Sequence, residues 1–317
     1  MEPIEQDGQQ PKEAIVALVG FLGAGKTTLL KRLTQAYASS GWSPFVILND
    51  YENAYLDAQQ LTELVAPNWL KALNGSCICC SGIQELRGEV NRIPERKRGI
   101  TLIEANGTSD AAKLMGFLGV GLHERFLPPV QISVVDAKNW QRRGEHNELE
   151  ANQIQVSTVI LLTRLDQISD SRHKQVVDEL STLNPLATVM PMEAFDHRTL
   201  PQLQPSSNQA LPMAHHKAHW SSCSVDLPPL PDYLCIQEIC DAIGPSVLRI
   251  KGCTVVGNRE GYLYFERCPD GEVYIRPYNG EPETGTKLLA VGPGSVPEQL
   301  NQAVAASLES AKSRISN

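Results

Sequence analysis

Residues 20–28 read GFLGAGKTT, which matches the pattern of a phosphate-binding loop. An unbroken apolar run at 14–19 precedes this segment, and leucines at helical spacing follow it through residues 26–38. In this context, backbone N–H groups and a helix N-terminus converge on an anion. The pattern therefore predicts a P-loop nucleotide-binding domain rather than a chance glycine-rich turn. The residues expected to bind nucleotide here are Gly20, Gly23, Ala24, Gly25, Lys26, Thr27 and Thr28.

Two side chains of the loop have separate expected roles. Lys26 should reach the β- and γ-phosphates of a nucleoside triphosphate, as the catalytic cation of the loop. The Thr27 hydroxyl should ligate Mg²⁺.

A carboxylate from another strand should support the magnesium ion or its water. Glu104 directly follows the apolar run 100–103 and is the preferred candidate, with Gly107 bringing a backbone N–H to the γ-phosphate. Asp136, at the end of the run 130–135, is the rival. For either carboxylate the simpler alternative is a helix cap or a solvated side chain.

The segment after the apolar run 158–162 is expected to recognise the base. It reads Thr163-Arg164-Leu165-Asp166, where P-loop GTPases carry Asn/Thr-Lys-x-Asp. An aspartate at this place accepts two hydrogen bonds from guanine, whereas adenine would leave it unpaired. Arg164 departs from lysine, although a guanidinium also stacks on a base. Guanine is therefore the expected base.

Apolar runs alternate with helical segments as far as residue 192, which predicts an α/β fold with a mainly parallel sheet covered by helices. Residues 202–231 are rich in Pro, Ser, His and Gln, as linkers are. Beyond them, short alternating strands between two helices predict a smaller α+β domain. The expected organisation is a flexible tail (1–12), a P-loop GTPase domain (13–201), a linker (202–231) and a C-terminal domain (232–317).

Charge and cysteine content narrow the possible partners. The chain carries 36 acidic and 28 basic residues, a net charge of -8, which argues against nucleic acid or an anionic membrane as the main partner. Residues 1–12 are polar, unlike a signal peptide, and no apolar run is long enough to span a membrane. Eight cysteines without an export signal are expected to be thiols in the cytoplasm.

Three of these cysteines crowd into the segment NGSCICCSG, at Cys77, Cys79 and Cys80. Cys77 and Cys80 have the CxxC spacing of a chelating turn, and Cys79 could supply a third thiolate. The alternatives are buried free thiols or a redox pair. A site for a soft metal ion is the favoured interpretation.

Taken together, these motifs resemble those of the CobW-like metallochaperone GTPases. The resemblance rests on GFLGAGKTT, NGSCICCSG, the segments at Glu104, Asp136 and 153–166, and LRIKG at 248–252. It implies a GTPase that binds GTP, Mg²⁺ and zinc or cobalt, and that serves a metal-requiring client apoprotein, with a homo-oligomer possible. It also places Asn49 and Asp50 in the first switch segment, near magnesium and the transferable metal. Asp50, which stands in place of the family's usual glutamate, is thereby a candidate catalytic residue and metal ligand.

Three linker histidines, His215, His216 and His219, resemble a shorter form of the family's histidine-rich stretch. They are candidate metal ligands, with a solvated polar linker as the equal alternative. The favoured function is a GTP-hydrolysing metallochaperone. A metal-sensing or storage module, and a P-loop kinase acting on a small molecule, are the rival functions.

Overall fold

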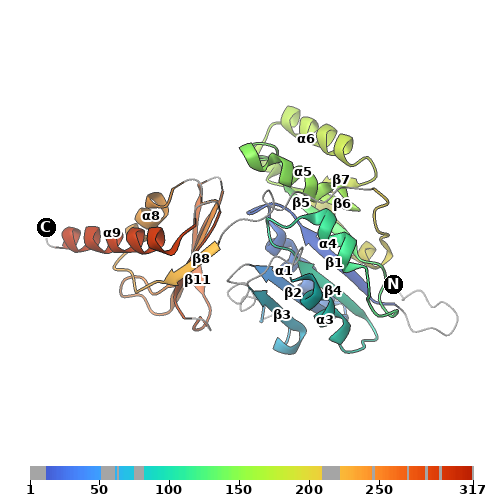
Figure 1. The fold of residues 1–317 in the computed structure, drawn as a ribbon, viewed down its shortest axis with the longest axis horizontal. Coiled ribbons are helices and arrows are strands. Elements are labelled where there is room, and N and C mark those ends of the chain that lie inside the picture. The colour runs from blue at the N-terminus through green and yellow to red at the C-terminus, as the bar shows by residue number, and fades with distance from the viewer. Residues whose placement is uncertain are drawn as a thin grey trace. The chain divides into compact units, whose positions relative to one another are not determined.

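The computed structural model describes residues 12–50, 61–62, 64–74, 82–208, 222–244, 247–269, 271–282, 285–292 and 295–315 (Figure 1). The described residues divide into two compact units, one ending at 208 and the other beginning at 222. Each unit contains a sheet with helices packed on it.

The first unit is built on a seven-stranded sheet in which all neighbouring strands are parallel, in the order β3-β2-β4-β1-β5-β6-β7. The strands are β1 (Ala14–Val19), β2 (Ser43–Asp50), β3 (Leu70–Asn74), β4 (Gly99–Glu104), β5 (Val130–Asp136), β6 (Val159–Thr163) and β7 (Thr188–Pro191). Since parallel strands end at one edge of a sheet, the loops after β1, β4, β5 and β6 meet there.

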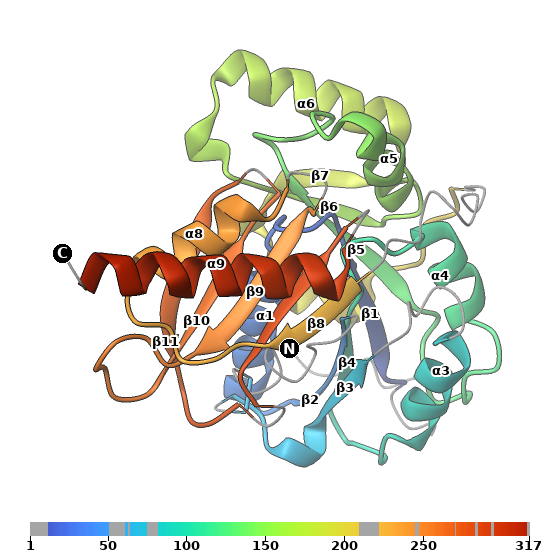
Figure 2. The ribbon, with the colours of Figure 1, turned by 60° about the vertical axis from the view of Figure 1, so that its left-hand side comes forward.

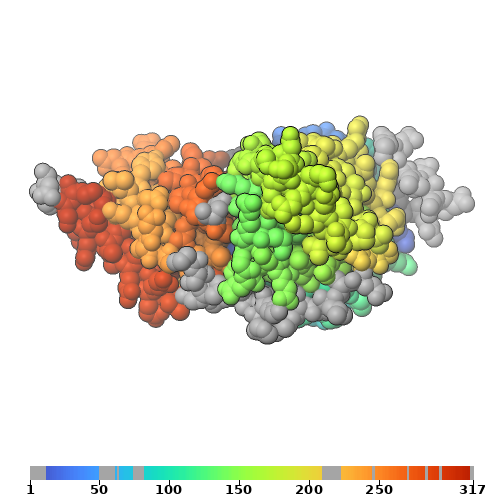
Figure 3. Space-filling model, turned by 90° about the horizontal axis from the view of Figure 1, so that it is seen from above, coloured from blue at the N-terminus to red at the C-terminus, as the bar shows by residue number. Residues whose placement is uncertain are grey.

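Helices cover this sheet, as the alternation in the sequence predicts. They are α1 (Lys26–Ser39), α3 (Ile83–Arg92), α4 (Ala111–Leu118), α5 (Asn147–Gln155) and α6 (Asp170–Leu183). Helices α3 to α6 form one layer in which successive helices touch, whereas α1 packs on β1, β2 and β4 (Figure 2). The outer surfaces of α5 and α6, green to yellow-green, face the viewer in Figure 3. The expected α/β class is confirmed.

β1 is the middle strand of the seven-stranded sheet, and all six of its residues are buried. Its odd-numbered residues, among them Ile15 and Ala17, pack with apolar residues of α3 and α4. Alternation turns Val16 and Leu18 to the other face of the sheet, where α1 buries its leucines. The phosphate loop therefore leaves a rigid strand and enters a helix fixed to the same sheet.

Two edge strands of this sheet are absent from the expected pattern. β3 reads LKALN and β7 reads TVMP, and neither has the long apolar run of a central strand. β7 is only partly buried along its length. Edge strands carry a weaker apolar signal because one side of the strand has no neighbour to cover it.

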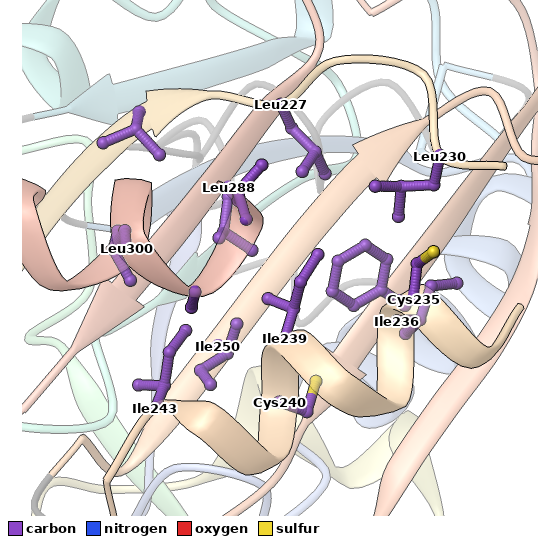
Figure 4. Packing of buried hydrophobic residues seen from close by; sticks show 14 of the residues in the cluster. Leu227, Leu230, Cys235, Ile236, Ile239, Cys240, Ile243, Ile250, Leu288 and Leu300 are labelled. Atoms are coloured by element: carbon purple, nitrogen blue, oxygen red, sulfur yellow. The ribbon is translucent and has the colours of Figure 1, made fainter. Parts of the chain in front are cut away.

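The second unit is a five-stranded antiparallel sheet, in the order β11-β10-β9-β12-β8, with two helices. Its elements are β8 (Ser222–Asp226), α8 (Leu234–Ala242), β9 (Arg249–Thr254), β10 (Tyr262–Arg267), β11 (Val273–Tyr278), β12 (Lys287–Val291) and α9 (Pro297–Ile315). Apolar residues of α8 and α9 pack on one face of the sheet (Figure 4). None of the described helices of either unit is long and apolar enough to cross a membrane.

Strand β8 lies inside the segment 202–231, whose composition is that of a linker. Cys223 and Val225 are buried in the core of the second unit, while Ser224 and Asp226 are exposed. β8 lies at one edge of the sheet and pairs with β12, the last strand of this sheet in the sequence. The alternation of buried and exposed residues in β8 is short, and the prolines and serines around it give the segment the composition of a linker. The expected linker, 202–231, therefore includes a strand of the second unit at its C-terminal end.

Gly252 in β9 makes room for a buried ring of β10. It lies opposite Phe265 in the register, and a Cβ at Gly252 would stand 2.1 Å from the ring. Phe265 itself is fully buried against the residues of α8. A glycine is thus required here by packing rather than by backbone conformation.

Candidate nucleotide-binding site

The phosphate loop between β1 and α1 takes its shape from glycines with positive φ angles. Gly20, Gly23 and Gly25 have φ values of 149°, 75° and 106°. A Cβ at Gly20 would lie 2.3 Å from the carbonyl oxygen of Val134 in β5, so a side chain is excluded. Gly25 caps the N-terminus of α1, and Ala24 donates its N–H to the oxygen of Phe21. The loop is held as a tight concavity of backbone at the end of the sheet.

Lys26 begins α1 and folds back across the loop. Its Nζ donates to the carbonyl oxygens of Gly20 at 2.7 Å and of Phe21 at 3.1 Å, and the side chain is buried. A positive charge thus lies at the mouth of the concavity, where it meets an anion that the loop holds. Thr28, one residue beyond Thr27, is exposed on α1.

Thr27 and Glu104 meet although 77 positions separate them in the sequence. The Thr27 hydroxyl donates to Glu104 Oε1 at 2.7 Å. β4 pairs directly with β1, so the end of β4 lies beside the start of α1. A hydroxyl and a carboxylate are hard oxygen ligands of the kind that Mg²⁺ prefers, and the residues present fit that ion.

Asp136, the rival carboxylate, has different partners. Its Oδ1 accepts from Asn139 N–H, and its Oδ2 accepts from Asn139 Nδ2 at 2.9 Å. Two guanidinium groups also approach Oδ2: Arg164 at 3.3 Å and Arg143 at 3.5 Å. Asp136 therefore holds together the segments that follow β5 and β6.

The loop 105–110, between β4 and α4, lies against the phosphate loop. A Cβ at Gly107 would stand 2.8 Å from the backbone nitrogen of Leu22. Within the loop, Asn106 Oδ1 accepts from the N–H and the hydroxyl of Thr108. Asn106 Nδ2 is buried with no hydrogen-bond partner among the described residues. A free amide donor beside the phosphate loop suits a nearby anion.

Helix α5 holds the same loop from the other side. Asn152 Oδ1 accepts from the N–H of Ala111, and Gln153 Nε2 donates to the carbonyl oxygens of Gly107 and Ser109. Neither residue stands out in the sequence, because a buried amide in a short helix has no spacing that marks it. The sequence signal for their role is two adjacent amide residues, Asn152 and Gln153, in a helix that buries both.

Thr163 joins the segment expected to recognise the base to the phosphate loop. It ends β6, and its hydroxyl lies 3.0 Å from the carbonyl oxygen of Ala24 and 3.3 Å from that of Val135. Arg164 follows in the left-handed conformation, with a φ of 58°. Asp166 lies in a short 3₁₀ turn, η3 (Leu165–Gln167), and its side chain is exposed. The predicted base segment and the phosphate loop are thus parts of one site.

A buried charge cluster packs against the phosphate loop at Phe21. The guanidinium of Arg143 lies 4.7 Å from the Phe21 ring and pairs with Glu150 Oε1 at 3.6 Å. Burial raises the pKa of Glu150 to about 7, although Arg143 and the N–H of Gln141 oppose this shift. Burial also lowers the pKa of His146, whose ring lies beside Phe21.

Residues 14–191 match the family model of the CobW/HypB/UreG nucleotide-binding domain. The chain belongs to the CobW/HypB/UreG family. This match covers more than half of the chain and every described residue of the site, and it confirms the resemblance seen in the sequence.

Curated relatives of this CobW/HypB/UreG protein include two with zinc in their names. Zinc-regulated GTPase metalloprotein activator 1 of Dictyostelium discoideum is 27% identical over 218 residues, covering 56% of this chain and 45% of the relative. The zinc chaperone YjiA of Escherichia coli is 28% identical over 184 residues, covering 56% of each. The chain thus spans about half the length of these relatives. The crystal structure of Zn(II)-bound YjiA GTPase from E. coli aligns with a TM-score of 0.41, at 18% identity, over 93% of this chain and 98% of that one.

The expected metal ligands fall largely outside the described residues. Cys77, Cys79 and Cys80 lie there, as do His215, His216, His219 and the side chain of Asp50. Within the described part of the chain, no cluster of three His, Cys, Asp or Glu side chains is arranged to hold a metal ion. Five further cysteines are buried in the second unit of this CobW/HypB/UreG protein: Cys223, Cys235, Cys240, Cys253 and Cys268.

The backbone shows where the switch segment and the cysteine loop begin. Asp50 ends β2 and Asn74 ends β3, and the two residues are partners in the parallel register. One residue earlier, Asn49 Nδ2 donates to the carbonyl oxygen of Leu73 at 3.3 Å. The last described residues of β2 and β3 therefore lie side by side at this edge of the sheet.

Proposed function

We propose that this protein is a GTP-hydrolysing metallochaperone that binds zinc, or cobalt, at Cys77, Cys79 and Cys80 and delivers it to a client apoprotein. The observation that carries the nucleotide half is the Thr27–Glu104 contact at 2.7 Å, on a phosphate loop shaped by glycines. The family supports the metal half, since curated relatives are named as zinc chaperones.

In this proposal, each residue around the phosphate loop has a separate role in hydrolysis. Lys26 lies where it can exchange its two carbonyl partners for phosphate oxygens and offset their charge. Thr27 and Glu104 would hold Mg²⁺, which supplies further positive charge to the phosphates when bound. Gly107 would offer its N–H to the γ-phosphate, and Asp50 would approach the same site from β2.

Guanine recognition falls to Asp166, which follows β6 in a turn after Thr163. The Thr163 hydroxyl, tied to Ala24, sets the distance between the base and the phosphates. Arg164 is held by Asp136 in an orientation from which its planar guanidinium can stack on the base.

The cargo site would combine three thiolates, which bind zinc and cobalt strongly. His215, His216 and His219 would be weaker accessory ligands. The protein would act in the cytoplasm on a metal-requiring client, alone or as a homo-oligomer. The acidic chain gives no reason to propose nucleic acid or membrane as a partner.

The test is phosphate release from GTP and from ATP, with Lys26→Ala as the inactive control. GTP should be the preferred substrate, and Lys26→Ala should abolish turnover because the phosphates lose their main cation. Equal turnover of GTP and ATP would overturn the guanine assignment. Transfer of phosphate to a small-molecule acceptor would indicate a kinase instead. A client that does not stimulate turnover would favour a metal sensor or store.

A further inference from the structure

One backbone peptide beside the phosphate loop is held from both ends. The oxygen of Gly107 accepts from Gln153 Nε2 at 2.9 Å, and the N–H of Thr108 donates to Asn106 Oδ1 at 2.9 Å. These two atoms belong to the same peptide group. Gln153 also donates to Ser109 O at 3.2 Å, so one amide of α5 spans the second half of the loop.

These hydrogen bonds to the Gly107–Thr108 peptide, which we call the clamp, affect a glycine that lies beside the phosphate loop. Gly107 has no side chain to restrict its dihedral angles, so its N–H is free to turn unless its neighbours are fixed. Gly107 packs against the backbone nitrogen of Leu22 in the phosphate loop. The Gly107 N–H belongs to the preceding peptide, between Asn106 and Gly107. With the Gly107–Thr108 peptide fixed and the Asn106 side chain bonded to it, this N–H can turn only by coupled changes of Asn106 ψ and Gly107 φ, so its direction is restricted.

Gln153 itself is anchored firmly. Its carbonyl oxygen accepts from Gln131 Nε2 at 2.6 Å and from Ser133 Oγ at 2.7 Å, both on β5. Asn184 Nδ2 fixes the next carbonyl, that of Ile154, at 2.7 Å. The side chain of Gln153 is fully buried, so it reaches the loop from a rigid base rather than from a mobile surface.

From this geometry we propose that Gln153 is a positioning residue for hydrolysis, which fixes the Gly107–Thr108 peptide so that the Gly107 N–H points to the γ-phosphate. This inference rests on the proposed function. Gln153 touches neither nucleotide nor metal and acts through Gly107 alone. A purely structural amide would stabilise the fold without distinguishing a triphosphate from a diphosphate. A positioning amide affects only the state that contains the γ-phosphate.

The test compares Gln153→Leu with Gln131→Leu in the full-length protein. Both glutamines are about 1% exposed and undergo the same substitution, but Gln131 donates to Ser133, Ser157 and the Gln153 carbonyl rather than to loop 105–110. When Gln131 is replaced, the Ser133 hydroxyl still donates to the Gln153 carbonyl, so the base of Gln153 stays fixed. The measurements are kcat for GTP, the affinities for GDP and for a non-hydrolysable GTP analogue, and the thermal midpoint of unfolding.

Gln153→Leu should lower kcat by about 10- to 100-fold, since a misplaced group costs this much even where it makes no contact with substrate. It should weaken the GTP analogue while the affinity for GDP stays unchanged. Gln131→Leu should lower the thermal midpoint comparably but leave kcat close to that of the wild type. If Gln153→Leu does not fold, Gln153→Met removes the same donor with a flexible apolar side chain and should give the same kcat loss.

Equal kcat losses in the two leucine variants would overturn this inference while leaving the proposed function intact. Parallel losses of GDP and GTP-analogue affinity in Gln153→Leu would do the same. A wild-type protein that binds GTP but does not hydrolyse it would overturn both.

Discussion

Arg143 is shared by two buried carboxylates beside the phosphate loop. It pairs with Asp136 and with Glu150, and Asp136 is further held by Asn139 and Arg164. Burial is the main cause that raises the pKa of Glu150 to about 7, and the nearby charge of Asp136 adds to this rise.

The stability of the fold should therefore depend on pH through Glu150. A carboxyl whose pKa is about 7 when folded and 4.5 when unfolded binds its proton more tightly in the folded state. The resulting stabilisation is complete below pH 4.5 and is lost as the pH rises through 7, a difference of roughly 3 kcal/mol.

Glu150→Gln, which can still accept the N–H of Gln141, removes this titration. Its thermal midpoint should rise relative to that of the wild type between pH 5 and pH 8, as followed by calorimetry. A difference in midpoint that stays constant over this range would contradict the assignment.

The residues of the site differ in how far the sequence predicts their contacts. Thr163 stands where a guanine-binding motif usually has asparagine, and its hydroxyl still reaches the carbonyl oxygen of Ala24. The meeting of Thr27 and Glu104 could be anticipated, because parallel neighbouring strands bring such residues to one edge. Gln153 could not, because its role depends on which carbonyls it meets after folding.

At the scale of elements, the strands predicted for the first unit are those with a neighbouring strand on each side. Residues 14–19, 100–103 and 130–135 are all apolar or mostly apolar, and each segment lies within a central strand of the first sheet. The missed strands, β3, β7, β8 and β12, are short, and the first three lie at sheet edges.

Packing across β9 and β10 gives a prediction for the second unit. Gly252→Ala would place a methyl group 2.1 Å from the Phe265 ring, which has no room to move in a filled core. Overpacking of this kind costs about 1–3 kcal/mol. The variant should unfold at a lower temperature, as monitored by circular dichroism.

Gly244→Ala is the matched control, since the nearest atom to its added Cβ is Gln299 Nε2 at 3.8 Å. It should leave the midpoint nearly unchanged. Equal effects of the two alanine substitutions would show that lost glycine flexibility, rather than the ring, is responsible.

At the scale of the whole molecule, nucleotide and metal sites should communicate through the paired ends of β2 and β3. Asp50 and Asn74 are register partners, and the expected switch segment and cysteine loop begin just after them. Order imposed on one segment by a γ-phosphate and magnesium would then extend to the other. Hydrolysis would release both and loosen the metal.

Such coupling has to be reciprocal. With magnesium present, a non-hydrolysable GTP analogue should tighten zinc or cobalt binding relative to GDP, by roughly 5- to 150-fold or about 1–3 kcal/mol. The measurement is a metal titration against a competing chelator in each nucleotide state. A triple Cys77, Cys79 and Cys80→Ser variant is the control and should lose the tight site. Equal metal affinities in the two states would exclude nucleotide-gated release.

The pairing of β8 with β12 also bears on how the chain is made. Ser222 is the register partner of Val291, so β8, the first strand of the second sheet in the sequence, pairs with β12, the last. A ribosome delivers β8 long before β12 emerges, whereas the strands of the first sheet are complete once β7 has been made. The order of synthesis thus leaves the nucleotide-binding unit free to fold first, while the second sheet cannot be completed until β12 has been made.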